Sequence, residues 1–340
     1  DRRQRQMCIR DSHIIVSNRV ELRSFVMVKI YKNEIDDSKV LECKQIEDNC
    51  WIRLINPTDE EIEKVSAQIE IPSSLISQVL VEKELPRVKQ VDGATLVVID
   101  VPYMKDKSIK NKYITYPLGI IICDNLHVVT VSLKEHEFMQ QFADGSVDTF
   151  FTYKKNRFLI QIFLKSSEVY LNTLYLIDED IQKMEKNTYN STNNRALINF
   201  LNMQKTLVYF LTSLQANSHV LERLQSEDIL PMYEEDKLLL SDAVIENKQC
   251  IETSIVYRDI LDSTMEAYGS IISNNLNVIM KFLAGITIVF SIPTMISSFL
   301  GMNVPLGVVG ESEFSFLVVC IISFLVSFLI ACWLKKRNML

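Results

Sequence analysis

Two long stretches of this chain contain no charged residue. Residues 282–299 have no Asp, Glu, Lys or Arg, and residues 314–334 have none either. Each stretch is close to the roughly 20 residues that a helix needs to cross a hydrocarbon core of about 30 Å. A buried hairpin of a soluble protein is the alternative, but both runs are long and pure for one. We therefore expect two membrane spans.

Features of several other protein classes are also missing. With 36 Lys and Arg against 43 Asp and Glu, the formal net charge is −7, and no dense basic block lies away from the termini, which argues against nucleic-acid binding. The seven cysteines form no C-x-x-C pair, so we interpret them as reduced thiols. There is no Walker loop and no G-x-S-x-G, and the four histidines are isolated, so no enzyme is predicted.

The first 26 residues lack the apolar segment of a signal peptide, so nothing in them would carry the next domain across a membrane. Met27 precedes a strand-like segment and looks like a natural start. We expect residues 1–26 to be a non-native or disordered leader.

The charges that flank the two spans set their direction. Lys281 precedes the first span and Lys-Lys-Arg at 335–337 follows the second, whereas the connecting residues 304–313 contain Glu but no Lys or Arg. By the positive-inside rule, both termini are cytoplasmic and the loop is external. We expect a multi-pass protein of the cell (plasma or inner) membrane.

Residues 27–157 alternate segments rich in Val, Ile and Tyr with turn and helix signals. The strand-like segments are 27–31, 51–55, 94–104, 113–123 and 126–133. Between them, Asn56 and Thr58 are placed to cap a helix, and a second helix-like segment ends before Pro86. This pattern predicts a cytosolic α/β domain.

Long helices are predicted after that domain. Apolar residues recur at three- and four-residue steps over 158–232, which indicates a helical hairpin. Few Gly or Pro interrupt 233–303, so one stalk helix of roughly 100 Å can continue into the first span. The predicted fold class is an α+β membrane protein with an N-terminal α/β domain, a long helical stalk, and two C-terminal transmembrane helices. The external loop is 304–313, the second span 314–334, and the basic cytosolic tail 335–340.

Hydroxyl side chains recur along the first span. They occupy one narrow arc of the helix, and we call them the polar stripe: Thr287, Ser291, Thr294 and Ser298. The same spacing extends to Asn277, Met280 and Ala284. One interpretation is structural, because such hydroxyls often bond to their own helix and small residues often mark helix packing. The other is a water-lined path, which requires several copies around an axis and so a homo-oligomer.

The first span ends in Gly301, Met302 and Asn303. This GMN motif, together with the long preceding helix, the two C-terminal spans and the basic tail, resembles the CorA family of divalent-cation transporters. The resemblance covers nearly everything from Met27 onward. Leu300 departs from the family, because many members have an aromatic residue there.

The resemblance implies a homopentameric pore lined by the first spans and surrounded by the second spans. Gly301, Met302 and Asn303 would form the selectivity filter, where the Asn303 amides meet hydrated Mg²⁺. The polar stripe would continue this contact inwards, and Met280 and Leu283 would form a narrow apolar gate.

The resemblance also implies regulation by Mg²⁺ bound between the cytosolic domains of neighbouring subunits. Asp242 matches the stalk carboxylate of this site, and Glu266 stands where a lower acidic residue is usual. Ser77 and Gln78 replace the acidic pair expected on the opposing surface, where Gln78 would offer only an amide oxygen. The alternative for Asp242 is a solvated stalk residue.

The expected function is passive influx of hydrated Mg²⁺, with Co²⁺ or Ni²⁺ as further substrates, through a pore gated by cytosolic Mg²⁺. One alternative is Zn²⁺ transport of the ZntB-like branch, whose members typically vary the middle motif residue that is Met302 here. Another is a sensor or scaffold that uses its spans only as an anchor in the lipid bilayer.

Overall fold

The computed structural model describes residues 27–33, 39–91, 93–105, 113–188, 194–227, 229–302 and 314–337. It has two compact units, which are described separately. The first runs to Ile260 without Thr188 and Asn194, and the second holds these two residues together with the chain from Leu261 onward. The predicted leader, Asn303 and the predicted external loop lie outside the described residues.

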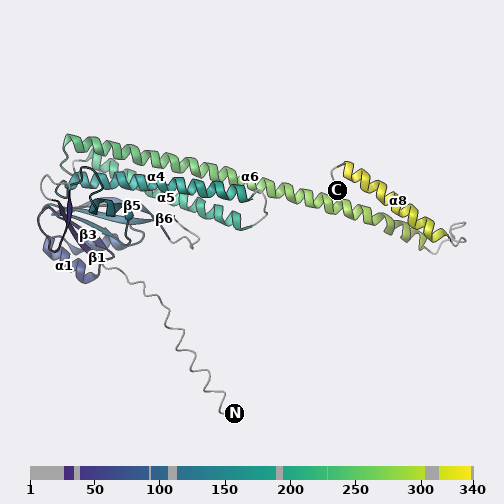
Figure 1. Ribbon diagram of the computed structural model, residues 1–340, viewed down its shortest axis with the longest axis horizontal. Helices are drawn as coiled ribbons and strands as arrows, with labels where there is room; N and C mark the ends of the chain where they lie inside the picture. Colours follow the sequence, from purple (N-terminus) through teal and green to yellow (C-terminus); the bar gives the residue numbers. More distant parts are fainter. Residues whose placement is uncertain are drawn as a thin grey trace, which may run out of the picture. The chain divides into compact units, whose positions relative to one another are not determined.

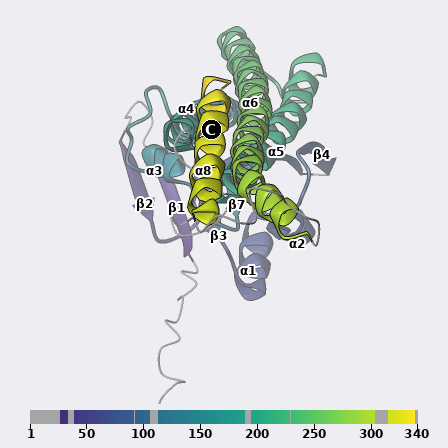
Figure 2. The same cartoon turned by 90° about the vertical axis from the view of Figure 1, so that its right-hand side faces the viewer.

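A seven-stranded sheet forms the centre of the first unit. Its strands are β1 (Met27–Asn33), β2 (Val40–Cys43), β3 (Trp51–Ile55), β4 (Arg87–Val91), β5 (Ala94–Met104), β6 (Tyr113–Cys123) and β7 (Val128–Ser132). The order is β2-β1-β3-β7-β6-β5-β4, and only the β3–β7 pair is parallel. The five predicted strands are confirmed. The unpredicted strands β2 and β4 lie at opposite edges of the sheet (Figure 2), where short strands with charged residues are usual.

Helices cover both faces of the sheet. The helices α1 (Asp59–Ile69) and α2 (Ser73–Ser77) pack on one face, and α4 (Lys155–Thr188), α5 (Asn194–Ser226) and the first part of α6 (Glu234–Leu300) lie over the other (Figure 1). Trp51 of β3 faces this second layer, where its ring centroid lies 5.1 Å from that of Phe158. The next residue, Ile52, belongs to the core under α1. Every residue of β3 is buried, as expected for a strand covered on both faces.

The capping prediction is confirmed at Thr58. Its side chain accepts a hydrogen bond from the Glu61 amide at 3.4 Å, and the Glu61 carboxylate accepts one from the Thr58 amide at 2.9 Å, which completes a capping box. The second helix is shorter than predicted, since α2 and the 3₁₀ turn η1 (Gln78–Leu80) end well before Pro86. Val81 and Leu85 are 53% and 72% exposed, so no apolar face continues that would hold a longer helix on the sheet.

The turn η1 is held close to the sheet at Gly119 of β6. The Cβ of an alanine at this position would lie 2.4 Å from Cγ2 of Val79, a fully buried side chain. We expect Gly119→Ala to lower the free energy of unfolding by about 1–3 kcal/mol, because overpacking displaces buried groups. Urea denaturation followed by tryptophan fluorescence, to which Trp51 and Trp333 both contribute, measures this. A second substitution, Val79→Ala, should recover part of the loss, and a single variant as stable as the parent would contradict the contact.

The helical layer is fixed to the sheet and closed at its end by polar contacts. Asp100 of β5 accepts a hydrogen bond from the Ser213 hydroxyl at 2.6 Å, and burial raises the pKa of this carboxyl while that bond opposes the rise. Arg157 of α4 donates to Asp236 and Glu235, both at 2.8 Å, at the start of α6. The α/β domain followed by helices of 34, 33 and 67 residues confirms the predicted fold class.

In the second unit, the end of α6 and the helix α8 (Ser315–Lys336) lie side by side (Figure 1). Both are long and apolar enough to cross a membrane, and each contains an 18-residue apolar segment with a mean hydropathy of 1.9 in α6 and 2.8 in α8. Only 6% of the segment in α6 and 11% of the segment in α8 is buried within the chain. The unit therefore presents nearly all of its apolar surface outwards.

Candidate ion-conduction surface

One side of α6 is covered within the chain. Ile286 and Pro293 are half-buried. Gly285 is buried, and further half-buried residues follow it at steps of three and four: Val289, Ile292, Ile296 and Leu300. We call these five residues the covered stripe. On α8, Ser323, Ser327 and Leu334 are buried at the same kind of spacing. Small residues at such positions let two helix backbones approach closely. The pattern places the α6–α8 packing along these two faces.

The polar stripe lies on the other side of α6. Thr287, Ser291, Thr294 and Ser298 are all exposed. At about 100° per residue, their mean direction is about 180° away from that of the covered stripe. The polar stripe is therefore not the surface on which α8 packs. This finding removes one structural interpretation of the stripe, that its small residues serve the hairpin of this chain.

Three hydroxyls of the polar stripe donate to their own helix. Thr287 donates to the Leu283 carbonyl at 2.8 Å, Ser291 to Ile288 at 2.8 Å, and Thr294 to Phe290 at 3.0 Å. A hydroxyl has one donor and two acceptor lone pairs, so these oxygens can still accept hydrogen bonds from outside. Water held by a cation points its hydrogens outwards. The stripe thus offers a hydrated cation the acceptors that it needs.

The ends of the stripe also lie on exposed surface. Asn277, Met280, Leu283 and Ala284 are exposed on α6, with Met280 at 55% and Leu283 at 56%. At the other end, the Gly301 amide donates to the Ser297 carbonyl at 3.0 Å, and the side chain of Met302 is 53% exposed. Asn303 lies outside the described residues.

A comparison with known families identifies the chain. Residues 47–336 match the family described as CorA-like Mg²⁺ transporter protein. The chain belongs to this family. Its class is therefore that of CorA-family divalent-cation transporters, as the sequence predicted, and neither an anchored scaffold nor an enzyme is the usual function of that family.

Individual CorA relatives agree in sequence and fold. The cobalt/magnesium transport protein CorA of Methanocaldococcus jannaschii is 29% identical over 262 residues, which cover 74% of this chain and 79% of that protein. The complete structure of the CorA magnesium transporter from the same organism has a TM-score of 0.78 at 24% identity, covering 92% of this chain and 98% of that one. The ZntB cytoplasmic domain from Vibrio parahaemolyticus shares the fold, with a TM-score of 0.55 and 13% identity over 74% of this chain and 98% of its own.

The candidate regulatory carboxylates are placed on the long CorA helix α6. Asp242 is exposed in the first unit, and Glu266 is exposed in the second. The described part of the chain contains no group of three or more His, Cys, Asp or Glu side chains that could hold a metal.

Gln78 has partners that the sequence did not predict. Its Oε1 accepts a hydrogen bond from Nη2 of Arg87 at 3.0 Å and one from Nζ of Lys89 at 3.3 Å. A dication bound to this oxygen would replace two cationic donors and lie beside them, which is electrostatically unfavourable. The arrangement argues against Gln78 as a metal ligand. The exposed Ser77 hydroxyl donates to the Ser73 carbonyl at 3.2 Å.

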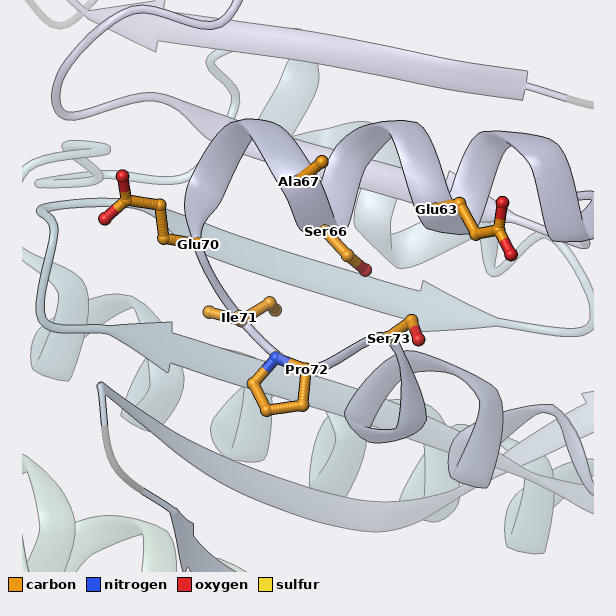
Figure 3. Close-up of a pocket in the computed structure, with 7 residues that line it drawn as sticks. All are labelled: Glu63, Ser66, Ala67, Glu70, Ile71, Pro72 and Ser73. Carbon is orange, nitrogen blue, oxygen red and sulfur yellow. The ribbon is translucent and has the colours of Figure 1, made fainter.

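A hollow of about 490 Å³ lies between α1 and α2, on the face of the sheet opposite α4 and α5. Two carboxylates, Glu63 and Glu70, stand at its rim, and the buried Ser66 hydroxyl between them has no hydrogen-bond partner. Figure 3 shows the two carboxylates pointing towards opposite ends of the hollow. They do not converge on one ion, so this hollow is not a metal centre.

Proposed function

We propose that the chain assembles as a homopentamer that conducts hydrated Mg²⁺ inwards across the cell membrane, with α6 helices around the pore. The observation that carries this proposal is the exposed polar stripe on the side of α6 opposite α8. In a single chain this stripe would face lipid, where unpaired polar groups are costly. Copies arranged around an axis would turn the stripes towards a common water-filled path.

The chemistry of the proposed lining suits a cation that keeps its water. Mg²⁺ gives up water reluctantly and usually retains several waters when bound. At the external mouth, the Asn303 amides of the subunits would accept hydrogen bonds from the water shell, and the Thr and Ser oxygens would do so further in. An inside-negative potential would favour entry of a dication by about 4.6 kcal/mol per 100 mV.

A gate is proposed at the inner end of the stripe, where Met280 and Leu283 expose apolar side chains on neighbouring parts of the α6 surface. A ring of such side chains can close a pore by excluding water. Opening then requires the α6 helices to move apart by enough for a hydrated ion to pass.

Regulation by cytosolic Mg²⁺ is proposed to act through Asp242 and Glu266. Without carboxylates at Ser77 and Gln78, and with Arg87 and Lys89 beside Gln78, the bound dication would be held by fewer charges. We therefore propose a weak regulatory site that responds only to high internal Mg²⁺. Both termini would lie on the cytoplasmic side, as the flanking charges indicate.

The transported ion is tested by competition. Proteoliposomes that contain the full chain should take up Mg²⁺, and we expect excess external Co²⁺ to inhibit this uptake, with Ni²⁺ acting similarly. The name of the M. jannaschii relative, a cobalt/magnesium transport protein, supports this expectation. Uptake of Zn²⁺ in place of Mg²⁺, unaffected by excess Mg²⁺, would instead assign the chain to the ZntB-like function.

A further inference from the structure

A groove runs along α8 on a side that does not pack against α6. It has a volume of about 580 Å³ and is lined by Cys320, Ile321, Phe324, Leu325 and Phe328. Phe324 and Phe328 are 76% and 61% exposed, so no part of the described chain covers their rings. An acyl chain is an apolar occupant of the kind that such a groove accepts within a membrane span.

The positively charged side chain of Lys335 lies beyond the end of this groove. Lys335 follows Phe328 by seven residues, which places it about two turns and 10 Å further along α8, within about 20° of the same direction. Lys335 and its neighbour Lys336 are both exposed. The ion pairs found within the described residues do not involve either lysine.

Arg337 is different. It lies over the ring of Trp333 at 5.6 Å, on another side of α8 from the groove. The last turn of α8 thus carries Lys335 and Lys336 at the end of the groove, whereas Arg337 is held over the ring of Trp333.

We infer that this face of α8 binds an anionic phospholipid, with an acyl chain in the groove and the phosphate group at Lys335 and Lys336. Along α8 the apolar groove comes first and the two lysines follow, just as the acyl chain of such a lipid is followed by its phosphate group. A second copy of α8 is a poorer occupant, because a parallel copy would bring like charges together at Lys335. Juxtamembrane lysines attract anionic lipids, and the effect falls off over a Debye length.

Native mass spectrometry of the full-length protein tests this inference with phosphatidylglycerol and phosphatidylcholine as probes. We expect more phosphatidylglycerol than phosphatidylcholine to bind at equal concentration. The double variant Lys335→Gln/Lys336→Gln should lose this preference, since each lysine removed weakens binding roughly five-fold. Phe324→Ala should weaken the binding of both lipids.

Two matched control variants distinguish a specific lipid-binding site from a general attraction of anionic lipids to positive charge. Arg337→Gln removes one charge from the same turn and should retain the preference, and Leu329→Ala removes an exposed apolar side chain outside the groove and should leave binding unchanged. Equal binding of the two lipids by the parent protein, or equal losses in Arg337→Gln and the double variant, would overturn the inference. So would a change in oligomeric state, with no change in bound lipid, on substitution of Phe324. None of these readouts depends on ion transport.

Discussion

Asn303→Ala is expected to reduce Mg²⁺ uptake by roughly tenfold or more, or to abolish the preference for Mg²⁺ over other dications. Under the proposed function, every subunit contributes one Asn303 amide to the mouth of the pore. A typical hydrogen bond contributes about 0.5–1.5 kcal/mol, so the loss of several such acceptors at once is enough for this effect. The measurement is the initial rate of uptake into proteoliposomes at matched protein density.

The control for this substitution is Asn275→Ala. Asn275 is exposed on the same helix, but it points well away from the arc of the polar stripe. It should leave uptake unchanged. Normal rate and selectivity in Asn303→Ala would remove Asn303 from the proposed filter, whatever the pore does elsewhere.

The second large effect is expected on replacing the polar stripe by side chains of similar volume without hydroxyls. The combined substitutions are Thr287→Val, Ser291→Ala, Thr294→Val and Ser298→Ala. They remove the exposed oxygens that would accept hydrogen bonds from the water shell of the ion in place of bulk water. We therefore expect uptake to fall by roughly tenfold or more. The α6–α8 packing should be unchanged, because it uses the other side of α6.

Ser297→Ala is the matched control for the stripe. Ser297 is exposed and adjacent to Ser298, yet lies about 100° around the helix from it. Transport should be normal in this variant. If the variant with all four substitutions also transports normally, the hydroxyls of the polar stripe serve only to form hydrogen bonds with the backbone of their own helix.

The sequence predicted most of the fold because local signals and tertiary packing agree. The segments that became β5 and β6 are rich in Val and Ile and are almost entirely buried, and Thr58 caps α1 through a contact only three residues away. The prediction failed where the outcome depends on distant partners. The helical segment expected to end just before Pro86 stops at Leu80, because its buried residues up to Val79 belong to the core under the sheet, whereas Val81 and Leu85 are largely exposed.

In the candidate ion-conduction surface too, local features were predictable from the sequence, and features that depend on distant partners were not. The spacing of Thr287, Ser291, Thr294 and Ser298 defines the polar stripe, but spacing cannot tell which side of a helix packs on its neighbour. The burial of Gly285 and Ser327 answers that question. The partners of Gln78 were also beyond the sequence, since Arg87 and Lys89 reach it only because β4 returns beside η1.

Potential-driven entry of Mg²⁺ into proteoliposomes tests most directly whether this CorA-family chain forms an Mg²⁺ conduction path. With an internal Mg²⁺ indicator and low internal Mg²⁺, entry should rise as the interior is made more negative, and should fall when internal Mg²⁺ is raised. Entry no faster than in protein-free liposomes, at any potential, would contradict the account.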